Sequence, residues 1–192
     1  IGAAVDKVKI QNTTSLVNMN IEEGVSGLSK IGGIVGSSKG SLILEKCANN
    51  GSLNLDGAYD YVGGLVGYME GGLIESSINY QNITSNKAKY LGGLVGFVDN
   101  SSFEGIKNSA NLGVISGSSF DISVNGNTIT MKVGELVGYL GNHLSNSVTN
   151  NYYIGNDAFG VVINESLNPQ AQKTSDDDIT SGRLAYLLND AF

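Results

Sequence analysis

Four residue types are almost missing from this sequence of 192 residues, which has one proline, one cysteine, one histidine and no tryptophan. The single cysteine, Cys47, excludes an internal disulfide. Any Ser-His-Asp arrangement or histidine zinc site would have to be built around His143, which we interpret as a surface residue of the variable turn GNHLSN. No apolar run reaches the roughly 18 residues of a membrane-spanning helix, and no basic amphipathic stretch indicates a helix lying on a membrane.

Positive charge is also scarce, with 11 Lys and Arg against 18 Asp and Glu and a net charge of -7. Such a surface repels phosphate backbones, and no cluster of basic residues offsets it, so we expect no nucleic-acid partner. The hydrophobic content of 41% argues against disorder. The sequence opens IGAAV, without a methionine or a leader, so we expect a signal peptide to be absent or removed and flanking domains of a longer chain to exist.

Glycine is abundant, with 27 residues, and much of it lies in a repeated opening. The four copies read IGGIVG, VGGLVG, LGGLVG and VGELVG, and their first glycines are Gly32, Gly63, Gly92 and Gly134. Successive copies are therefore 31, 29 and 42 residues apart. Self-similarity at such a period is typical of repeat proteins.

A second element follows each opening and also aligns between the units. One position holds Leu44, Ile74, Ile106 and Leu144, and a position three residues later holds Cys47, Ser77, Ser109 and Ser147. Asn49, Asn79 and Asn111 follow, and Thr149 takes this place in the fourth unit. β-Branched residues and glycine dominate, and no period near 3.6 persists, so each unit is predicted to form two short strands.

A unit of about 30 residues cannot offset its own backbone entropy, so the units must bury one another's apolar faces. The sequence thus predicts an all-β fold, a parallel β-helix of about four repeats. We place these repeats at 31–61, 62–90, 91–132 and 133–166, after a half repeat at 1–30, and the whole β-helix domain at 1–168.

The third position of the opening reads Gly33, Gly64, Gly93 and Glu135, and because an unpaired glutamate is seldom buried we expect it to face outward. Alternation then sends the next residue inward, and this inner ladder comprises Ile34, Leu65, Leu94 and Leu136. The same alternation predicts an outward apolar stripe of Val35, Val66, Val95 and Val137 beside Tyr68, Phe97 and Tyr139. Loops or a partner must cover such a stripe. Gly63 and Gly67 give a neighbouring strand room to approach, or the chain room to bend.

The third unit is longer because it contains FDISVNGNTITM, Phe120 to Met131. Asn125 and Gly126 favour a two-residue type I′ turn, which places Ile122 opposite Ile129 and Phe120 opposite Met131. We expect a hairpin that projects from the solenoid. It either packs back as a decorative loop or forms an interaction surface.

Beyond Pro169 the pattern changes, and residues 169–192 are predicted to form a short capping helix. Ser175 or Thr180 can cap its start, Asp176, Asp177 and Asp178 oppose the helix dipole, and Leu184, Leu187 and Leu188 form an apolar stripe.

The glycine-Leu-x-Gly openings, each followed by a Ser-x-Asn or Ser-Ala-Asn element, resemble the GLUG motif repeats of secreted and surface-anchored bacterial proteins. TSGRLAYLLN is similar to the segment that often closes such arrays. The resemblance implies an exported or cell-surface location and a repetitive β fold. These repeats accompany immunoglobulin A proteases and adhesin-like proteins, but the HExxH signature of those proteases is absent here. Unit four departs from the pattern at Glu135 and in SVTNNYYIG.

Candidate chemistry is sparse, and we expect no cofactor, no metal and no catalysis. Cys47 occupies a position where the other units have serine, so we interpret it as a small ladder residue and not a nucleophile. The three aspartates at 176–178 match no calcium motif. The carboxylates Asp60, Glu75, Asp99 and Glu104 are scattered among turns, whereas the glycan-cleaving β-helices need paired carboxylates.

The sequence therefore predicts a noncatalytic stalk or adhesion module. A second interpretation is a glycan-binding module that stacks sugars on Tyr59, Tyr61, Tyr90, Tyr139, Tyr152 and Tyr153, with a host glycan or protein as partner. A third is an accessory region of a larger secreted protease or glycanase. The candidate interaction surface is the hairpin together with Tyr59, Tyr61, Tyr68, Phe97 and Tyr139.

Overall fold

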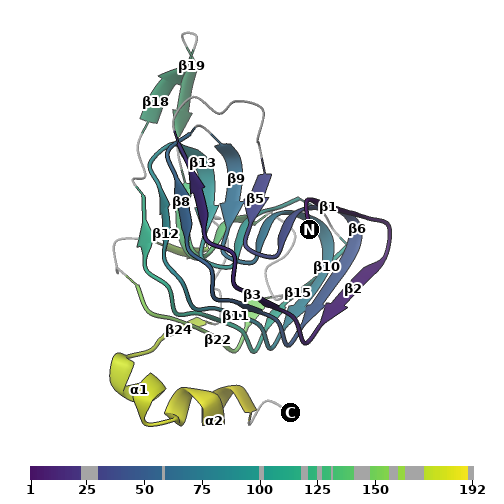
Figure 1. Cartoon of the computed structure of the whole chain (residues 1–192), viewed down its shortest axis with the longest axis vertical. Coiled ribbons are helices and arrows are strands. Elements are labelled where there is room, and N and C mark those ends of the chain that lie inside the picture. Colours follow the sequence, from purple (N-terminus) through teal and green to yellow (C-terminus); the bar gives the residue numbers. More distant parts are fainter. Residues whose placement is uncertain are drawn as a thin grey trace.

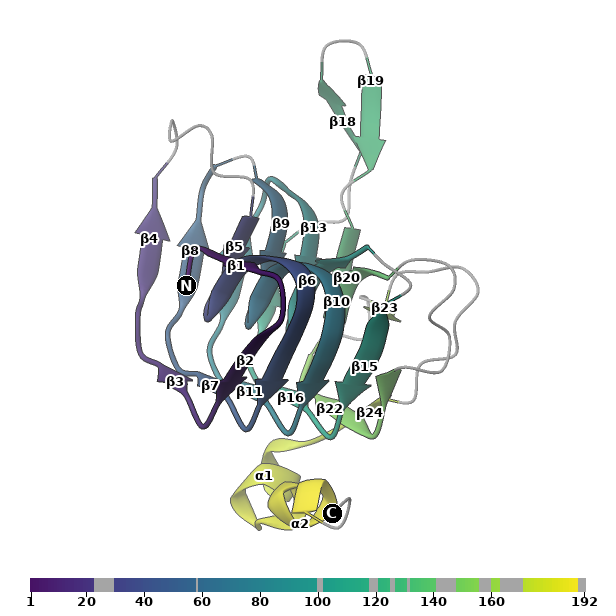
Figure 2. The same ribbon diagram turned by 90° about the vertical axis from the view of Figure 1, so that its right-hand side faces the viewer.

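The computed structural model of the chain is a parallel β-solenoid of about three turns with short C-terminal helices, which confirms the predicted fold class (Figure 1). It describes residues 1–22, 30–57, 59–99, 102–117, 121–124, 127–130, 132–140, 148–155, 160–162 and 171–189. Figure 2 shows the successive turns side by side. Within this part of the chain, no helix is long and apolar enough to cross a membrane.

Each turn of the solenoid contributes short strands in the same order. The first partial turn has β1 (Ala3–Val5), β2 (Val8–Gln11), β3 (Thr14–Ser15) and β4 (Met19–Ile21). The next has β5 (Lys30–Gly32), β6 (Val35–Glu45), β7 (Ala48–Asn49) and β8 (Leu53–Leu55). It is followed by β9 (Tyr59–Gly63), β10 (Val66–Glu75), β11 (Ile78–Asn79) and β12 (Ile83–Ser85), then by β13 (Ala88–Gly92), β14 (Val95–Val98), β15 (Phe103–Lys107), β16 (Ala110–Asn111) and β17 (Ile115–Ser116).

The hairpin strands β18 (Asp121–Val124) and β19 (Asn127–Thr130) follow, and then the next turn. This turn contains β20 (Lys132–Leu140), β21 (Val148–Thr149) and β22 (Asn151–Tyr153), and the strands β23 (Gly160–Val162) and β24 (Ala171–Lys173) pair with β20 and β22 as the beginning of a further turn. The chain then forms α1 (Asp176–Thr180) and α2 (Arg183–Asn189).

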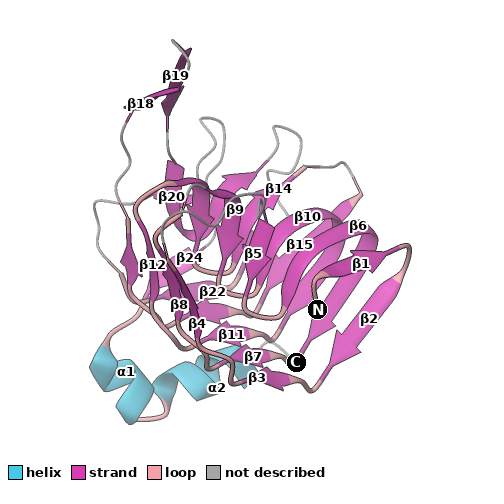
Figure 3. Ribbon diagram, turned by 45° about the horizontal axis from the view of Figure 1, so that its top comes forward, coloured by secondary structure: helices cyan, strands magenta, loops and turns pink. Residues whose placement is uncertain are grey.

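Equivalent strands of successive turns pair in parallel and in register. Gly63 lies opposite both Gly32 and Gly92, and Gly92 lies opposite Gly134. The Leu65 amide donates to the Leu94 carbonyl, and the Leu94 amide donates to Leu136. Figure 3 shows the resulting stack of strands. Matching residues of the repeats therefore stand in columns along the stack.

In the first three copies, a bend at the two residues that directly follow the first glycine divides the interior into two hydrophobic clusters. The larger cluster contains Ile34, Leu65, Leu94 and Leu136, and the smaller contains Ile31, Val62, Leu91 and Val133. The strand before the bend thus packs in the smaller cluster, and the strand after the bend packs in the larger one.

The predicted outward valine stripe is wrong, because Val35, Val66, Val95 and Val137 are fully buried in the larger cluster. The bend interrupts the alternation of the strand. The amides of both Leu65 and Val66 donate to the carbonyl of Leu94, as two consecutive residues do at a bulge, so both side chains face the same core.

The prediction that the third residue of each repeated opening faces outward is also wrong. A Cβ at Gly64 would lie 2.6 Å from Cγ of Asn79, which is fully buried, so this position faces the interior. Glu135, the residue of the fourth copy, is likewise fully buried.

The glycines on either side of the bend let two strands pack backbone against backbone. A Cβ at Gly63 would lie 2.7 Å from the Gly96 nitrogen and 2.9 Å from the Leu94 oxygen. A Cβ at Gly67 would lie 2.7 Å from the Ile31 nitrogen. These obstacles are backbone atoms, which cannot rotate away, so only glycine fits at either position.

We predict that Gly63→Ala lowers the free energy of unfolding by about 3 kcal/mol, because the added methyl forces adjacent strands apart. Urea denaturation of the variant measures this loss. Gly2→Ala is the matched control, since a Cβ there meets no atom within 4 Å, and it changes stability by less than about 0.5 kcal/mol. Equal effects of the two substitutions would contradict the close packing at the bend.

The register of the fourth unit is shifted by four residues from the predicted alignment. Val148, and not Leu144, pairs with Ile106, and Tyr153 pairs with Asn111. The position of Ser147 beside Ser109 is occupied by Asn151, whose Oδ1 accepts the Ser109 amide at 2.9 Å. Ser147 itself lies outside the described residues. The prediction failed because an alignment without gaps does not allow for the additional residues before this strand.

One corner of every turn adopts left-handed backbone geometry at a residue other than glycine. The φ angles are 53° at Lys46, 51° at Ser76, 50° at Asn108 and 50° at Asn150. Asparagine tolerates this conformation better than serine or lysine. Asn150 also donates to the Asn108 side chain at 2.8 Å, so asparagines can form a ladder at this corner.

We predict that Ser76→Asn raises the free energy of unfolding by about 1 kcal/mol, because it relieves strain at a positive φ and extends the amide ladder to a further turn. The comparison is Ser116→Asn on the exposed side of β17, where no such gain is expected. Chemical denaturation reports both values. A stability loss at position 76 would show that this corner is not strained.

The insertion forms an antiparallel hairpin that projects away from the stack, with Ile122 opposite Ile129 as predicted (Figure 2). Phe120, Asn125, Gly126 and Met131 lie outside the described residues. The two C-terminal helices lie along the side of the stack (Figure 1). Leu184 is buried there with Ala110, Leu112 and Tyr152, so the helices cover strands of more than one turn.

Candidate functional site

Cys47, which the sequence raised as a candidate for chemistry, has a structural role in this fold. Cys47 is 2% exposed, and its thiol donates to the carbonyl of Glu45 at 3.3 Å. Burial raises the pKa of this thiol, which therefore stays protonated and unreactive. His143 lies outside the described residues. Among the residues that are described, no three His, Cys, Asp or Glu side chains form a group able to hold a metal.

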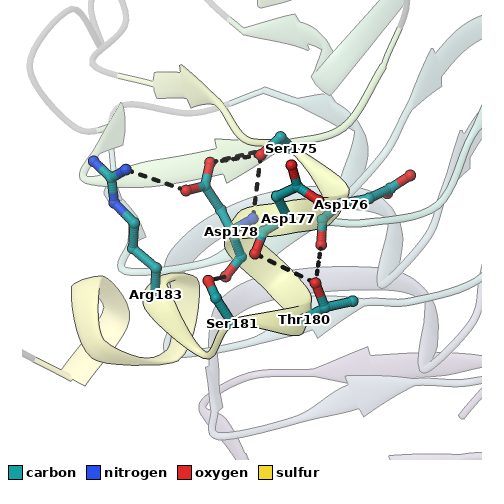
Figure 4. A network of polar contacts seen from close by, with 7 residues as sticks. All are labelled: Ser175, Asp176, Asp177, Asp178, Thr180, Ser181 and Arg183. Atoms are coloured by element: carbon teal, nitrogen blue, oxygen red, sulfur yellow. Dashed lines mark hydrogen bonds and ion pairs between the residues drawn. The ribbon is translucent and has the colours of Figure 1, made fainter.

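The three consecutive aspartates lie at the start of α1, as predicted (Figure 4). Ser175 caps the helix, and its hydroxyl and the Asp178 backbone form one half of a capping box. Asp178 accepts from the Ser175 hydroxyl at 2.9 Å and pairs with Arg183 at 3.3 Å. The hydrogen bond from Ser175 is the main cause that lowers the pKa of Asp178. These carboxylates stabilise the helix start.

The interior asparagines form a hydrogen-bonded ladder along the stack. Nδ2 of Asn49 donates to Oδ1 of Asn79 at 2.9 Å, and Nδ2 of Asn79 donates to Oδ1 of Asn111 at 2.8 Å. Each Nδ2 also donates to a backbone carbonyl two residues later, on Gly51, Gln81 or Gly113. All three side chains are fully buried, so their polar atoms are satisfied inside the fold.

A parallel ladder of small residues runs beside the asparagines. The Cys47 amide donates to Oγ of Ser77, and the Ser77 amide donates to Oγ of Ser109, both at 3.1 Å. The serine hydroxyls donate to carbonyls two residues earlier. These hydroxyls are thus engaged in holding one turn to the next and are not free nucleophiles.

An aromatic cluster lies at the outer side of the glycine bend. Its five half-buried rings belong to Tyr61, Tyr68, Tyr90, Phe97 and Tyr139. They form two rows, one on β9 and β13 and the other on β10, β14 and β20. The rows arise because register pairing places Tyr61 beside Tyr90, and Phe97 beside both Tyr68 and Tyr139.

The rings pack against one another within and between the rows. Phe97 is central, with centroid distances of 4.7 Å to Tyr61, 5.0 Å to Tyr90 and 4.8 Å to Tyr139. Tyr61 and Tyr90 stack at 5.7 Å. Such distances are typical of favourable aromatic pairs, so the cluster ties together the strands on both sides of the bend.

Charged and polar groups border the cluster. Nζ of Lys30 lies 4.2 Å from the centroid of Tyr68, and Nζ of Lys89 lies 5.4 Å from that of Tyr90, which allows cation–π attraction. Oη of Tyr68 donates to Asp99 at 2.7 Å. Desolvation is the main cause that raises the pKa of the Tyr61, Tyr68 and Tyr90 hydroxyls, and these rings remain neutral over the ordinary pH range.

The structure brings together only some of the aromatic residues that the sequence suggested. Tyr61, Tyr68, Tyr90, Phe97 and Tyr139 meet in the cluster, whereas Tyr59 is 3% exposed within the smaller core and Tyr152 is 4% exposed under the C-terminal helices. The inclusion of these two in an exposed surface is therefore wrong. Sequence reasoning missed Lys30 and Lys89. Lys30 could have been found, because it precedes its glycine by two residues, as Tyr61 and Tyr90 do.

Searches against protein-family models, curated proteins and solved structures found no match to this chain. The solenoid fold thus stands on the structure itself, and the resemblance to GLUG repeats stays a prediction.

We predict that Phe97→Ala lowers the free energy of unfolding by about 2–3 kcal/mol, because it removes the ring that contacts both rows. Tyr186→Ala on α2 is the control, since Tyr186 is 63% exposed and its loss has little effect. Thermal and urea unfolding of both variants give the comparison. An unchanged stability of the Phe97 variant would show that the rings do not hold the strands together.

Proposed function

We propose that this chain is a noncatalytic structural module, a stiff segment that holds or presents other parts of an exported or cell-surface bacterial protein. The observation that carries the proposal is the buried amide ladder of Asn49, Asn79 and Asn111, which joins successive turns through the interior. A fully satisfied polar ladder stabilises one register of stacking and resists shear between turns. The location is inferred from the resemblance of the repeated openings to those of GLUG proteins.

The hydrogen bonds of the cysteine, serine and aspartate side chains support the same proposal. The thiol of Cys47 and the hydroxyls of Ser77 and Ser109 are bound to backbone carbonyls. The three aspartates of α1 cap a helix. The aromatic rings pack mostly on one another. These side chains, whose residue types often do chemistry in enzymes, thus stabilise this fold.

The test is a binding screen of the purified chain against glycan arrays and immobilised extracellular-matrix proteins. A structural module gives only background signals at chain concentrations up to about 100 µM, an affinity weaker than about -5.5 kcal/mol. One saturable ligand with a tighter dissociation constant would overturn the proposal.

A second candidate function is glycan binding, and the aromatic cluster is the observation that favours it. Its five rings, with Lys30, Lys89 and Asp99 at the border, combine apolar faces with hydrogen-bonding groups. Carbohydrate sites use the same combination of a few polar groups and aromatic faces. If the array reveals a glycan, Tyr90→Leu should weaken its binding at least about tenfold, whereas Tyr186→Leu should not. Equal binding by both variants would place the glycan elsewhere.

A further inference from the structure

Tyrosine is the most abundant easily oxidised residue type in this chain. The sequence has nine tyrosines, no tryptophan and a single cysteine. That cysteine, Cys47, is 2% exposed and donates to a backbone carbonyl, so its thiol is protected from oxidants. A one-electron oxidant therefore reacts with tyrosine side chains, and the arrangement of their rings decides which products form.

Tyr61 and Tyr68 lie side by side across the glycine bend of one turn. Tyr61 is on β9 and Tyr68 is on β10, and their ring centroids are 5.5 Å apart, with 42° between the ring planes. Phe97 packs against both rings, at 4.7 Å from Tyr61 and 6.0 Å from Tyr68. The two phenols are half-buried, so a small oxidant reaches them while their neighbours keep them close together.

A carboxylate is placed to take the proton that Tyr68 loses on oxidation. Oη of Tyr68 donates to Asp99 at 2.7 Å. Loss of an electron makes a phenol strongly acidic, and a base that already accepts its hydrogen bond takes the proton as the electron leaves. The resulting radical is neutral, so the ammonium of Lys30, 4.2 Å from the ring centroid, does not oppose its formation. These surroundings favour oxidation at Tyr68.

We propose that Tyr61 and Tyr68 are a modification site, at which a one-electron oxidant joins the two rings as dityrosine. Each phenol gives up one electron and one proton, and the proton of Tyr68 passes through Asp99 to solvent. The two phenoxyl radicals then form a carbon–carbon bond between ring carbons ortho to the oxygens. The hydrogens on those carbons move to the oxygens and restore both hydroxyls. The protein thus loses two hydrogen atoms, and the oxidant accepts two electrons.

The orientation of the rings favours this pair over the next tyrosine in the same row. Tyr90 lies 5.7 Å from Tyr61, but these two rings are stacked, with only 23° between their planes, and present their faces to each other. Coupling joins ring edges, which the tilted pair brings together. Rings held in contact also couple faster than rings of separate molecules.

The new bond ties β9 to β10 across the bend and leaves the strand pairing between turns as it is. It goes beyond the function proposed above and does not depend on it, because the geometry of one turn is sufficient for the reaction.

The test is oxidation of the intact chain by photogenerated ruthenium(III) tris-bipyridine, with persulfate as the final electron acceptor. The expected product is a monomer that has lost two hydrogen atoms and fluoresces as dityrosine. Digestion with trypsin should place the bond within the single peptide 47–87, and tandem mass spectrometry should locate it at Tyr61 and Tyr68.

Three variants separate this pair from the other tyrosines. Tyr68→Phe keeps the ring but removes a coupling partner, and it should lower the dityrosine fluorescence of the monomer at least about tenfold. Tyr139→Phe is the matched control within the same cluster and should keep at least about half of the signal. Asp99→Asn removes the proton acceptor and should slow formation of the product at least about threefold.

Four results would overturn the proposal. They are a bond located at another pair of tyrosines, an equal loss of signal in the two phenylalanine variants, an unchanged rate in Asp99→Asn, and dityrosine found only in dimers joined through the exposed Tyr80 or Tyr186.

Discussion

The fold depends on close contact between backbones at the glycine bend. Strands on the two sides of the bend approach so closely that Gly63 and Gly67 have backbone atoms where a side chain would begin. This contact separates the two hydrophobic clusters, and it brings two rows of aromatic residues to the same place on the surface. The conformational cost of so much glycine in strands is offset by the apolar residues that the bend buries, since two consecutive side chains turn into the core at each copy.

The interior combines apolar columns with two columns of polar residues. Burying an amide is costly unless every donor and acceptor is satisfied. Here each asparagine side chain forms hydrogen bonds with the asparagine of a neighbouring turn and with a nearby backbone carbonyl. These bonds offset the cost of burying the amide. The repetition of asparagine in the sequence is therefore a physical requirement of this interior, because a single copy would leave a buried amide without its partner.

Much of the architecture follows from the repeats alone. The columns of glycine and of Leu65, Leu94 and Leu136 could be predicted because four copies agree. The direction of Val66 could not, because strict alternation is the expected rule for a strand and the bend breaks it locally. Glu135 led to the wrong direction for the third position of the opening. It is buried in the fourth copy, where the other copies have glycine.

The candidate site was harder to predict than the fold. Tyr61 and Tyr68 belong to different strands, and only the bend brings their rings to 5.5 Å. Tyr59 is only two residues from Tyr61, yet Tyr59 is buried and Tyr61 is half-buried at the surface. The residue type is the same, so it does not predict this difference. The place of Ser147 was mistaken because residues inserted before β21 moved the register by four positions, and Asn151 supplies the polar atom that the ladder needs there.

The asparagine ladder also has a consequence for how the chain reaches its final pairing. Parallel strands with similar sequences can slip past one another by a residue or by a whole unit while they assemble. A slip by one residue would leave the amides of Asn49 and Asn79 facing hydrocarbon, a penalty large enough to make such arrangements short-lived. The buried amides thus favour the native register over one that is shifted by a residue, because only pairing of asparagine with asparagine satisfies them in the interior.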